Sequence, residues 1–316
     1  MDEPLHRAQH VKIGFIGLGA MGSPMAARLQ SAGHELAVHD LQRESAALHL
    51  AAGATWAESP AAAAAHAEVL FTSLPGPAEV EAVALGAHGL REALRPGSAW
   101  FDLSTNSPPC VARLHALMAE RGVTLLDSPV SGGPRGAQAG RLALWVGGER
   151  AVFERHRGLL AAIGDQPYYV GPVGTGTVAK LAHNCASFSI QAVLAEVMTL
   201  GVKAGVEPHA LFRAIRQGAT GRARTFDRLP DHFLSGNFDP PAFALRLAHK
   251  DMALALELAR AHGVPMRIGE DAFAELEEAM RRGWGARDCR AAMTLQEERS
   301  GVTVRVPQEK LGGIND

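Results

Sequence analysis

The sequence predicts an α/β domain built on a doubly wound parallel sheet, followed by an all-α C-terminal domain. Three observations carry this prediction. Through the first half of the chain, apolar runs of strand length alternate with longer Ala- and Leu-rich stretches. The first apolar run leads into three glycines with the spacing G-x-G-x-x-G. Beyond about residue 173 the strand-length runs stop, and long helical segments punctuated by Gly and Pro take their place.

Six strands are expected in the first domain, residues 1–172, each a short apolar run. They are 13–16, 35–39, 69–73, 99–102, 124–127 and 142–147. Helices should lie between them, and one should begin at Pro60, because Pro suits a first helical turn and the alanines that follow favour helix. Residues 173–300 should form the all-helical domain, with its apolar helix faces buried, and the polar residues 301–316 a loosely held tail.

Composition restricts the classes of partner. At 316 residues the chain is long enough for two domains. Its net charge of −2, from 31 basic and 33 acidic side chains, gives no excess of positive charge that would favour binding to nucleic acid or an anionic membrane. Three widely separated cysteines predict neither a disulfide framework nor a metal site. No leader or membrane-length apolar run is apparent, so a cytoplasmic protein is expected, with a small molecule or another copy of the chain as its partner.

The glycines of "GFIGLGAMGSPM" have separate tasks in a strand-turn-helix unit. Gly17 permits the tight turn, Gly19 lets a pyrophosphate approach the backbone, and Gly22 lets the helix pack closely on the strand. Leu18, Ala20 and Met21 complete this loop. A glycine turn with a purely structural purpose is the alternative. The context favours a Rossmann domain, because a strand precedes the loop and a helix follows it.

Asp40 ends the next apolar run, 23 residues after Gly17. A carboxylate there would accept hydrogen bonds from the adenosine ribose hydroxyls and repel a 2′-phosphate, which favours NAD over NADP. Arg43 could still contact a phosphate. The alternative is an Asp that caps a loop beside a solvated Arg.

Polar residues form a narrow stripe on an otherwise apolar helix in "KLAHNCASFSIQ", namely Lys180, Asn184, Ser187 and Gln191. The stripe is either the solvated edge of the helix or a chemical face, and periodicity alone favours the solvated edge. A lysine can take the proton of a hydroxyl group while a hydride leaves the carbon, and in reverse it can donate that proton.

Small polar groups follow three other strands. In "SPVSGG", Ser131 offers a hydroxyl and Gly132 and Gly133 offer backbone N–H groups, donors that suit a carboxylate, although a plain glycine turn would read the same way. Thr105 in "DLST" and the pair Leu74 and Pro75 in "SLP" stand where ligands collect in an open parallel sheet. Helix-start chemistry is the alternative for Thr105, and a simple strand end for the pair.

Six blocks of the sequence, taken together and in order, resemble the β-hydroxyacid dehydrogenase family, the group of 3-hydroxyisobutyrate dehydrogenase and tartronate semialdehyde reductase. They are GFIGLGAMGSPMA, SLPGPAEV, DLST, DSPVSGGPRGAQAG, GTGTVAKLAHN and FALRLAHKDMALA. The resemblance implies a Rossmann domain, an all-helical domain and an active site in the cleft between them. It also implies NAD(P)-linked interconversion of a 3-hydroxy acid with its semialdehyde or keto form.

The resemblance also assigns roles. It makes Lys180 the catalytic lysine, Asn184 a substrate-holding asparagine, and Ser131, Gly132 and Gly133 a carboxylate clamp. Among other matched positions, Leu74, Pro75 and Thr105 would contact the cofactor. Phe243 and Lys250 would reach over the cleft from the helical domain, with Asp251 as a supporting partner. His183 stands where relatives often have another Asn, so a packing or helix-face role is expected for it. Arg222 and Arg224 could read a second anionic group or be surface charges.

The predicted function is hydride transfer between NAD and a small 3-hydroxy acid similar to 3-hydroxyisobutyrate, with Lys180 transferring the proton and a homodimer or homotetramer as the assembly. Glycerate, L-serine and 3-hydroxypropionate or its sulfonate analogues are further candidate substrates that the sequence does not rank. The alternatives are an imine reductase or semialdehyde reductase of the same architecture, a sugar-phosphate dehydrogenase, and a non-catalytic assembly module.

Overall fold

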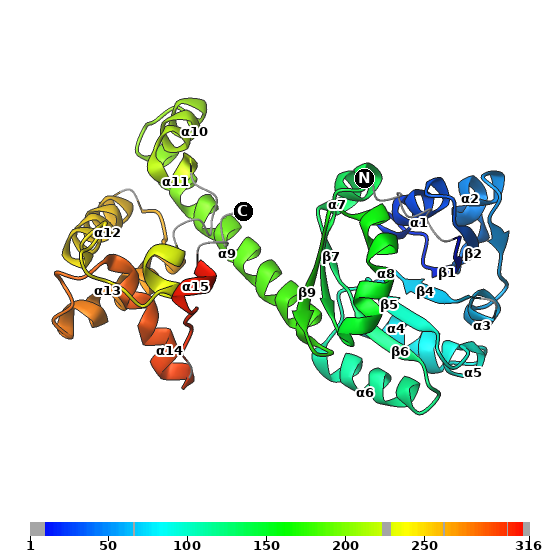
Figure 1. Ribbon diagram of the computed structural model, residues 1–316. Helices are drawn as coiled ribbons and strands as arrows, with labels where there is room; N and C mark the ends of the chain where they lie inside the picture. The colour runs from blue at the N-terminus through cyan, green and yellow to red at the C-terminus, as the bar shows by residue number, and fades with distance from the viewer. Residues whose placement is uncertain (1–9, 66, 223–228, 262, 302, 312–316) are drawn as a thin grey trace, which may run out of the picture. The chain divides into compact units, whose positions relative to one another are not determined.

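All six strands expected from the sequence form, and they lie in one nine-stranded sheet of the computed structural model (Figure 1). They are β1 (Lys12–Ile16), β2 (Glu35–His39), β4 (Val69–Thr72), β5 (Ala99–Asp102), β6 (Thr124–Asp127) and β8 (Ala143–Gly147). Three strands were not expected: β3 (Thr55–Trp56), β7 (Val130–Ser131) and β9 (Gln166–Gly171). The structure describes residues 10–65, 67–222, 229–261, 263–301 and 303–311.

The strand order is β3-β2-β1-β4-β5-β6-β8-β7, with β9 paired to β8. From β3 to β6 every pairing is parallel, so the doubly wound parallel sheet is confirmed. At the far edge, however, β8 runs antiparallel to both β6 and β7. Only α7 (Gly133–Ala139) connects β7 to β8. A connection this short reverses the chain, whereas a parallel return needs a longer crossover.

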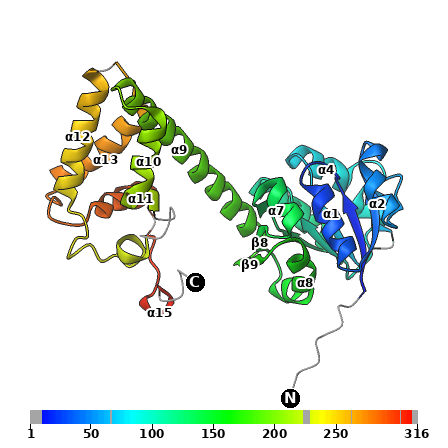
Figure 2. The same cartoon turned by 90° about the horizontal axis from the view of Figure 1, so that it is seen from above.

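Helices cover both faces of this sheet (Figures 1 and 2). Residues of α1 (Gly22–Ser31), α7 and α8 (Arg150–Ile163) share one apolar core with the strands, and α7 packs beside α1. The other core holds residues of α3 (Pro60–Ala64), α4 (Pro77–Leu85), α5 (Leu90–Ala93) and α6 (Pro108–Ala119). The helix expected at Pro60 is therefore α3, and the Ser59 side chain caps it by accepting the Ala62 N–H at 3.1 Å.

The chain divides into two compact units, residues 1–185 and 186–316. The division lies inside α9 (Thr175–Lys203), whereas the sequence suggests a boundary before that helix, at residues 172/173. The first turns of α9 belong to the sheet unit because they approach its strands closely. An ideal Cβ on Gly176 would lie 2.3 Å from the Trp145 carbonyl oxygen.

In its described residues the second unit contains helices joined by turns and loops, with no strand apart from one isolated bridge between Ala244 and Asp288. Its elements after α9 are α10 (Pro208–Gln217), α11 (Ala219–Arg222), the π-helical turn η2 (Pro230–Leu234), α12 (Leu245–Ala261), α13 (Arg267–Arg281), η3 (Cys289–Met293), α14 (Thr294–Ser300) and α15 (Gln308–Leu311). The Glu196 carboxylate of α9 accepts the first N–H groups of α13, from Ile268 and Gly269, at 3.0 and 3.1 Å. The expected all-α domain is confirmed.

Two details differ from expectation. Residues 305 and 306 of the tail are attached to the helical unit, since the Val306 N–H donates to the Leu234 carbonyl at 2.9 Å and Arg305 pairs with Glu297 at 2.7 Å. The apolar side of α9 is also incompletely buried, because Val178 and Leu181 are 54% and 40% exposed. No helix in the described part of the chain is long and apolar enough to cross a membrane.

Candidate active site

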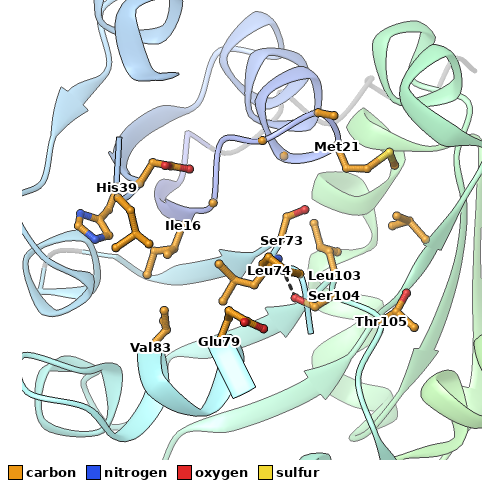
Figure 3. A pocket seen from close by; sticks show the side chains of 18 of the residues that line it. Ile16, Met21, His39, Ser73, Leu74, Glu79, Val83, Leu103, Ser104 and Thr105 are labelled. Carbon is orange, nitrogen blue, oxygen red and sulfur yellow. Dashed lines mark hydrogen bonds between the residues drawn. The ribbon is translucent and has the colours of Figure 1, made fainter. Parts of the chain in front are cut away.

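A cavity of about 870 Å³ opens in the first unit at the carboxyl ends of the parallel strands. The loops after β1, β2, β4 and β5 line it, and so do α4, β7 with the residues that follow it, and the start of α9. The ends of β4 and β5 bring three lining residues to the middle of the cavity, Ser73, Leu74 and Ser104 (Figure 3). Met21 and Thr105 lie to one side of them and His39 to the other. In an open α/β sheet this is where ligands bind, at the point where the strand order reverses between β1 and β4.

The three loop glycines differ in what surrounds them. Gly17 has a φ of +94°, and a Cβ there would lie 2.2 Å from the Ser73 carbonyl oxygen. A Cβ on Gly22 would lie 1.8 Å from the Gly17 carbonyl oxygen. At Gly19, by contrast, no atom lies within 4 Å of the Cβ position. Gly17 and Gly22 are therefore needed for the turn itself, whereas the absent side chain of Gly19 leaves open space on the cavity wall, as a pyrophosphate would need.

Asp40 lies at the end of β2 and lines the cavity. Its Oδ2 accepts the N–H of Leu18 at 2.7 Å, and its Oδ1 accepts the N–H of Gln42 at 2.9 Å, so the carboxylate is fixed against the glycine loop. Arg43 pairs with Glu58 at 3.1 Å, and its guanidinium lies 5.4 Å from the centroid of the Trp56 ring. The structure thus gives Arg43 partners other than a cofactor phosphate.

A buried carboxylate joins the loops after β4 and β5. Asp102 accepts hydrogen bonds from Thr72 Oγ1 and Asn106 Nδ2, both at 2.9 Å, and from the Ser104 N–H at 3.1 Å. Ser104 Oγ in turn accepts the Leu74 N–H at 2.9 Å, the dashed line in Figure 3. Burial raises the pKa of Asp102, against the opposing effect of these hydrogen bonds. The network fixes the backbone that carries Leu74 and Thr105.

A second buried carboxylate anchors the start of α9. Asp127 Oδ1 accepts the Gly174 N–H at 2.7 Å, and Oδ2 accepts the Thr177 N–H at 2.6 Å. Burial raises the pKa of this carboxyl, and the two backbone donors oppose that shift. Because N–H groups at a helix start otherwise lack partners, Asp127 sets where α9 begins and so where Lys180 points.

Lys180 faces the loop after β7. Its Nζ donates to the Val130 carbonyl oxygen at 2.7 Å and lies 5.9 Å from the centroid of the Trp145 ring. Burial lowers the pKa of this lysine, which increases the share of neutral amine at a given pH. The residues after Val130 line the same cavity as Lys180. Of these, Gly132 and Gly133 have φ values of +133° and +64°, a backbone region that favours glycine.

His183 follows Lys180 by about one helical turn. Its Nε2 lies 3.2 Å from Ser131 Oγ, and its ring centroid lies 5.0 Å from that of Trp145. His183 is thus an exposed residue on the face of α9 that contacts Trp145, and it also makes a hydrogen bond that the sequence does not indicate.

Most of the predicted site residues meet in the cavity. Its lining includes Gly17, Gly19, Ala20, Met21, Gly22, Asp40, Leu74, Pro75, Thr105, Ser131, Gly132, Gly133 and Lys180. Leu18 is buried and contributes its N–H to Asp40. Asn184 is partly buried, one turn beyond Lys180, and does not line the cavity.

The remaining predicted residues lie elsewhere or outside the description. Phe243 belongs to the second unit, is 42% exposed and gives its N–H to Asp288 at 3.1 Å. Arg222 is exposed in α11. The position of Arg224 and the side chains of Ser187, Gln191, Lys250 and Asp251 lie outside the described part of the chain.

The prediction missed other lining residues, among them His39, Ser73, Glu79, Val83 and Leu103. Position after a strand could have pointed to Ser73 and Leu103, which directly follow β4 and β5. Glu79 and Val83 lie on α4 and carry no comparable signal. The described residues contain no group of three or more His, Cys, Asp or Glu that could hold a metal ion.

Two family models together match nearly the whole chain. Residues 12–171 match the NAD binding domain of 6-phosphogluconate dehydrogenase, and residues 174–295 match the NAD-binding domain of NADP-dependent 3-hydroxyisobutyrate dehydrogenase. The chain is 37% identical to 2-(hydroxymethyl)glutarate dehydrogenase of Eubacterium barkeri, over 93% of this chain and 97% of that protein. It is 34% identical to the NAD-dependent L-serine dehydrogenase of Pseudomonas aeruginosa, over 92% and 99%.

Solved structures agree with these matches. Mycobacterium tuberculosis 3-hydroxyisobutyrate dehydrogenase, in a structure with L-serine, has a TM-score of 0.63 and 29% identity, covering 91% of this chain and 99% of that one. An imine reductase from Pseudomonas sp. has a TM-score of 0.76 at 17% identity, covering 90% and 99%, a likeness that shows a shared fold alone.

Proposed function

The chain belongs to the β-hydroxyacid dehydrogenase family of NAD(P)-dependent enzymes that act on hydroxyl groups, and we propose that it transfers a hydride between NAD and a small 3-hydroxy acid. One observation carries the proposal. A single cavity of the first unit is lined by the glycine loop, by a half-buried lysine and by a Ser-Gly-Gly loop that offers hydrogen-bond donors. These are a dinucleotide site, a proton-transfer group and a carboxylate site.

Lys180 is the proposed proton-transfer group. Bound NAD would supply a nicotinamide ring as the hydride acceptor for the carbinol carbon. The neutral amine of Lys180 takes the hydroxyl proton in this direction, and its ammonium form returns the proton in reverse. The lowered pKa supports this role, since the neutral amine is then available nearer to neutral pH. The Val130 carbonyl, which holds Nζ at 2.7 Å, directs the amine toward the loop that begins with Ser131.

Ser131, Gly132 and Gly133 are the proposed carboxylate clamp. A hydroxyl and two backbone N–H groups can surround a carboxylate without adding a bulky side chain. Three relatives are named for 2-(hydroxymethyl)glutarate, L-serine and 3-hydroxyisobutyrate, and each of these acids carries a CH₂OH group on the carbon that bears a carboxylate. Another relative, 3-sulfolactaldehyde reductase, is named for a sulfonate. We therefore propose an acid of the form that the first three share, oxidised to its semialdehyde. A carboxylate held by the clamp places the CH₂OH group two bonds away, within reach of Lys180.

The proposed cofactor is NAD rather than NADP. Asp40 and Glu79 line the cavity, and Lys180 is the one lysine or arginine among its described lining residues. Arg43 already pairs with Glu58. A 2′-phosphate near Asp40 would meet a carboxylate with no cation arranged to neutralise it, whereas ribose hydroxyls could donate to it.

A panel of substrates tests the proposal. Purified protein is assayed by NADH or NADPH absorbance with 3-hydroxyisobutyrate, L-serine, glycerate, 3-hydroxypropionate and 2-(hydroxymethyl)glutarate, each with NAD and with NADP. Turnover of at least one acid, faster with NAD, is expected. A cyclic imine with NADPH tests the imine reductase alternative, and Lys180→Met is the matched inactive control. Reduction of the imine without oxidation of any acid would refute the proposal.

A further inference from the structure

Ser131 has a neighbour that limits how it can bind an anion. Its Oγ lies 3.2 Å from His183 Nε2, across a separation of 52 residues in sequence. A serine hydroxyl has one proton to donate and two lone pairs that accept, whereas an ionised carboxylate only accepts. If the Ser131 proton were donated to His183, none would remain for a carboxylate in the cavity.

The imidazole can also serve as the donor. When Nε2 carries a proton, it donates to Ser131 Oγ, and the hydroxyl proton is then free to point elsewhere. A carboxylate beside Ser131 selects this arrangement, because only this one gives both hydrogen bonds. The two bonds then form a chain from His183 through Ser131 to the anion, in which each bond polarises the next.

The position of the imidazole is constrained by its surroundings. Its ring packs on Trp145 with the centroids 5.0 Å apart and the planes inclined by 47°. The backbone of His183 lies in α9, whose start is fixed by the two hydrogen bonds to Asp127. The His183 side chain is exposed to solvent, and its packing on Trp145 together with its place on α9 puts Nε2 next to Ser131.

We infer that His183 is a positioning residue for the substrate: its Nε2–H donates to Ser131 Oγ and thereby directs the Ser131 hydroxyl proton to the substrate carboxylate. The inference rests on the proposed function, in which Ser131 binds that carboxylate. His183 does not line the cavity that holds Lys180 and the glycine loop, so its effect on the substrate passes through Ser131. Its loss should therefore weaken binding of the acid more than it slows turnover.

Two substitutions separate this role from packing on Trp145. His183→Phe keeps a ring against Trp145 and removes both nitrogens, whereas His183→Gln keeps an N–H donor near Ser131. With the best acid of the substrate panel, His183→Phe should raise KM for the acid about five- to tenfold, the effect of one lost hydrogen bond, with kcat and KM for NAD within about twofold of wild type. His183→Gln should restore most of the acid KM.

A double-mutant cycle with Ser131→Ala decides whether His183 acts through Ser131. In that background His183→Phe should change KM for the acid by less than about twofold. Equal effects in the two backgrounds would overturn the inference, as would an unchanged KM in His183→Phe or a failure of His183→Gln to restore it. In each of these outcomes the wild-type protein still oxidises the acid, so only the inference about His183 fails. If the wild-type protein oxidises no acid, the proposed function fails as well. Circular dichroism checks that each variant is folded.

Discussion

A methyl group at residue 19 should separate cofactor binding from folding. In Gly19→Ala the new Cβ meets no atom within 4 Å, and the backbone there is outside the positive-φ region that favours glycine. Replacing a glycine under these conditions removes freedom from the unfolded chain and stabilises the fold by about 0.4–1 kcal/mol. For a unit of this size that corresponds to a rise in Tm of roughly 1–4 °C.

The same methyl group should weaken the affinity for NAD. It fills the open space beside the loop through which a pyrophosphate would approach the N–H groups at the start of α1. Displacing the anion from one such donor costs about 1.5–3 kcal/mol, the range for hydrogen bonds to charged groups. The dissociation constant for NAD should therefore rise by roughly ten- to a hundredfold. The two effects of one substitution have opposite signs.

Thermal unfolding without cofactor and titration with NAD measure the two effects separately. Gly22→Ala is the contrasting variant, because its Cβ would lie 1.8 Å from the Gly17 carbonyl oxygen and should destabilise the turn itself. If Gly19→Ala bound NAD as wild type does, the pyrophosphate would not lie over this loop. If Gly19→Ala lost several degrees of Tm without cofactor, the Cβ at residue 19 would not lie in open space.

Five further predictions concern turnover, its pH dependence, cofactor choice, stability and assembly. Lys180→Met should lower kcat by roughly 10²–10⁴ with NAD affinity nearly unchanged, and a folded variant with a tenth of wild-type turnover would remove Lys180 from its role. Burial lowers the pKa of Lys180, so the rate of oxidation by the wild-type protein should rise with pH and reach a plateau below about pH 10.4, the pKa of an exposed lysine. A rate that still rises above that pH would contradict this expectation. Asp40→Asn should narrow the preference for NAD over NADP, and a wild-type preference for NADP would refute that assignment. Asp127→Ala leaves two N–H groups at the start of α9 without partners and should lower the free energy of unfolding, measured in urea, by about 2–5 kcal/mol. Asp127→Asn keeps one acceptor and should lower that free energy by less. Light scattering should give a homodimer or homotetramer, and a mass near 33.4 kDa at all micromolar concentrations would count against it.

The six strands that the sequence predicted each contain a short run of apolar residues. In β4 and β5 every residue is buried and three of the four are apolar, so composition alone indicates a strand there. The unpredicted strands lack that indication. β3 and β7 have two residues each, and β9 contains a proline and an exposed Tyr168. These three strands form because they pair with neighbouring strands of the sheet. A local sequence pattern carries no information about that pairing.

The candidate site divides in the same way. Gly17, Gly19, Gly22 and Asp40 could be predicted because a known loop geometry requires them at a fixed spacing. The hydrogen bond between Ser131 and His183 could not, since it joins two segments 52 residues apart. Asp127 belongs to a motif that the sequence made conspicuous, yet its bonds to Gly174 and Thr177 depend on how α9 meets the sheet.

The packing of Trp145 gives this protein an internal optical probe. Its indole lies 5.0 Å from the His183 ring and 5.9 Å from the Lys180 ammonium nitrogen. Indole emission responds to charge close to the ring, so the fluorescence of Trp145 should depend on the same two side chains that are proposed to orient the acid and move its proton. The three other tryptophans are Trp56, Trp100 and Trp284. Subtracting the spectrum of Trp145→Phe isolates the signal of this indole and should let the binding of ligands near Lys180 be followed in real time without a coupled reaction.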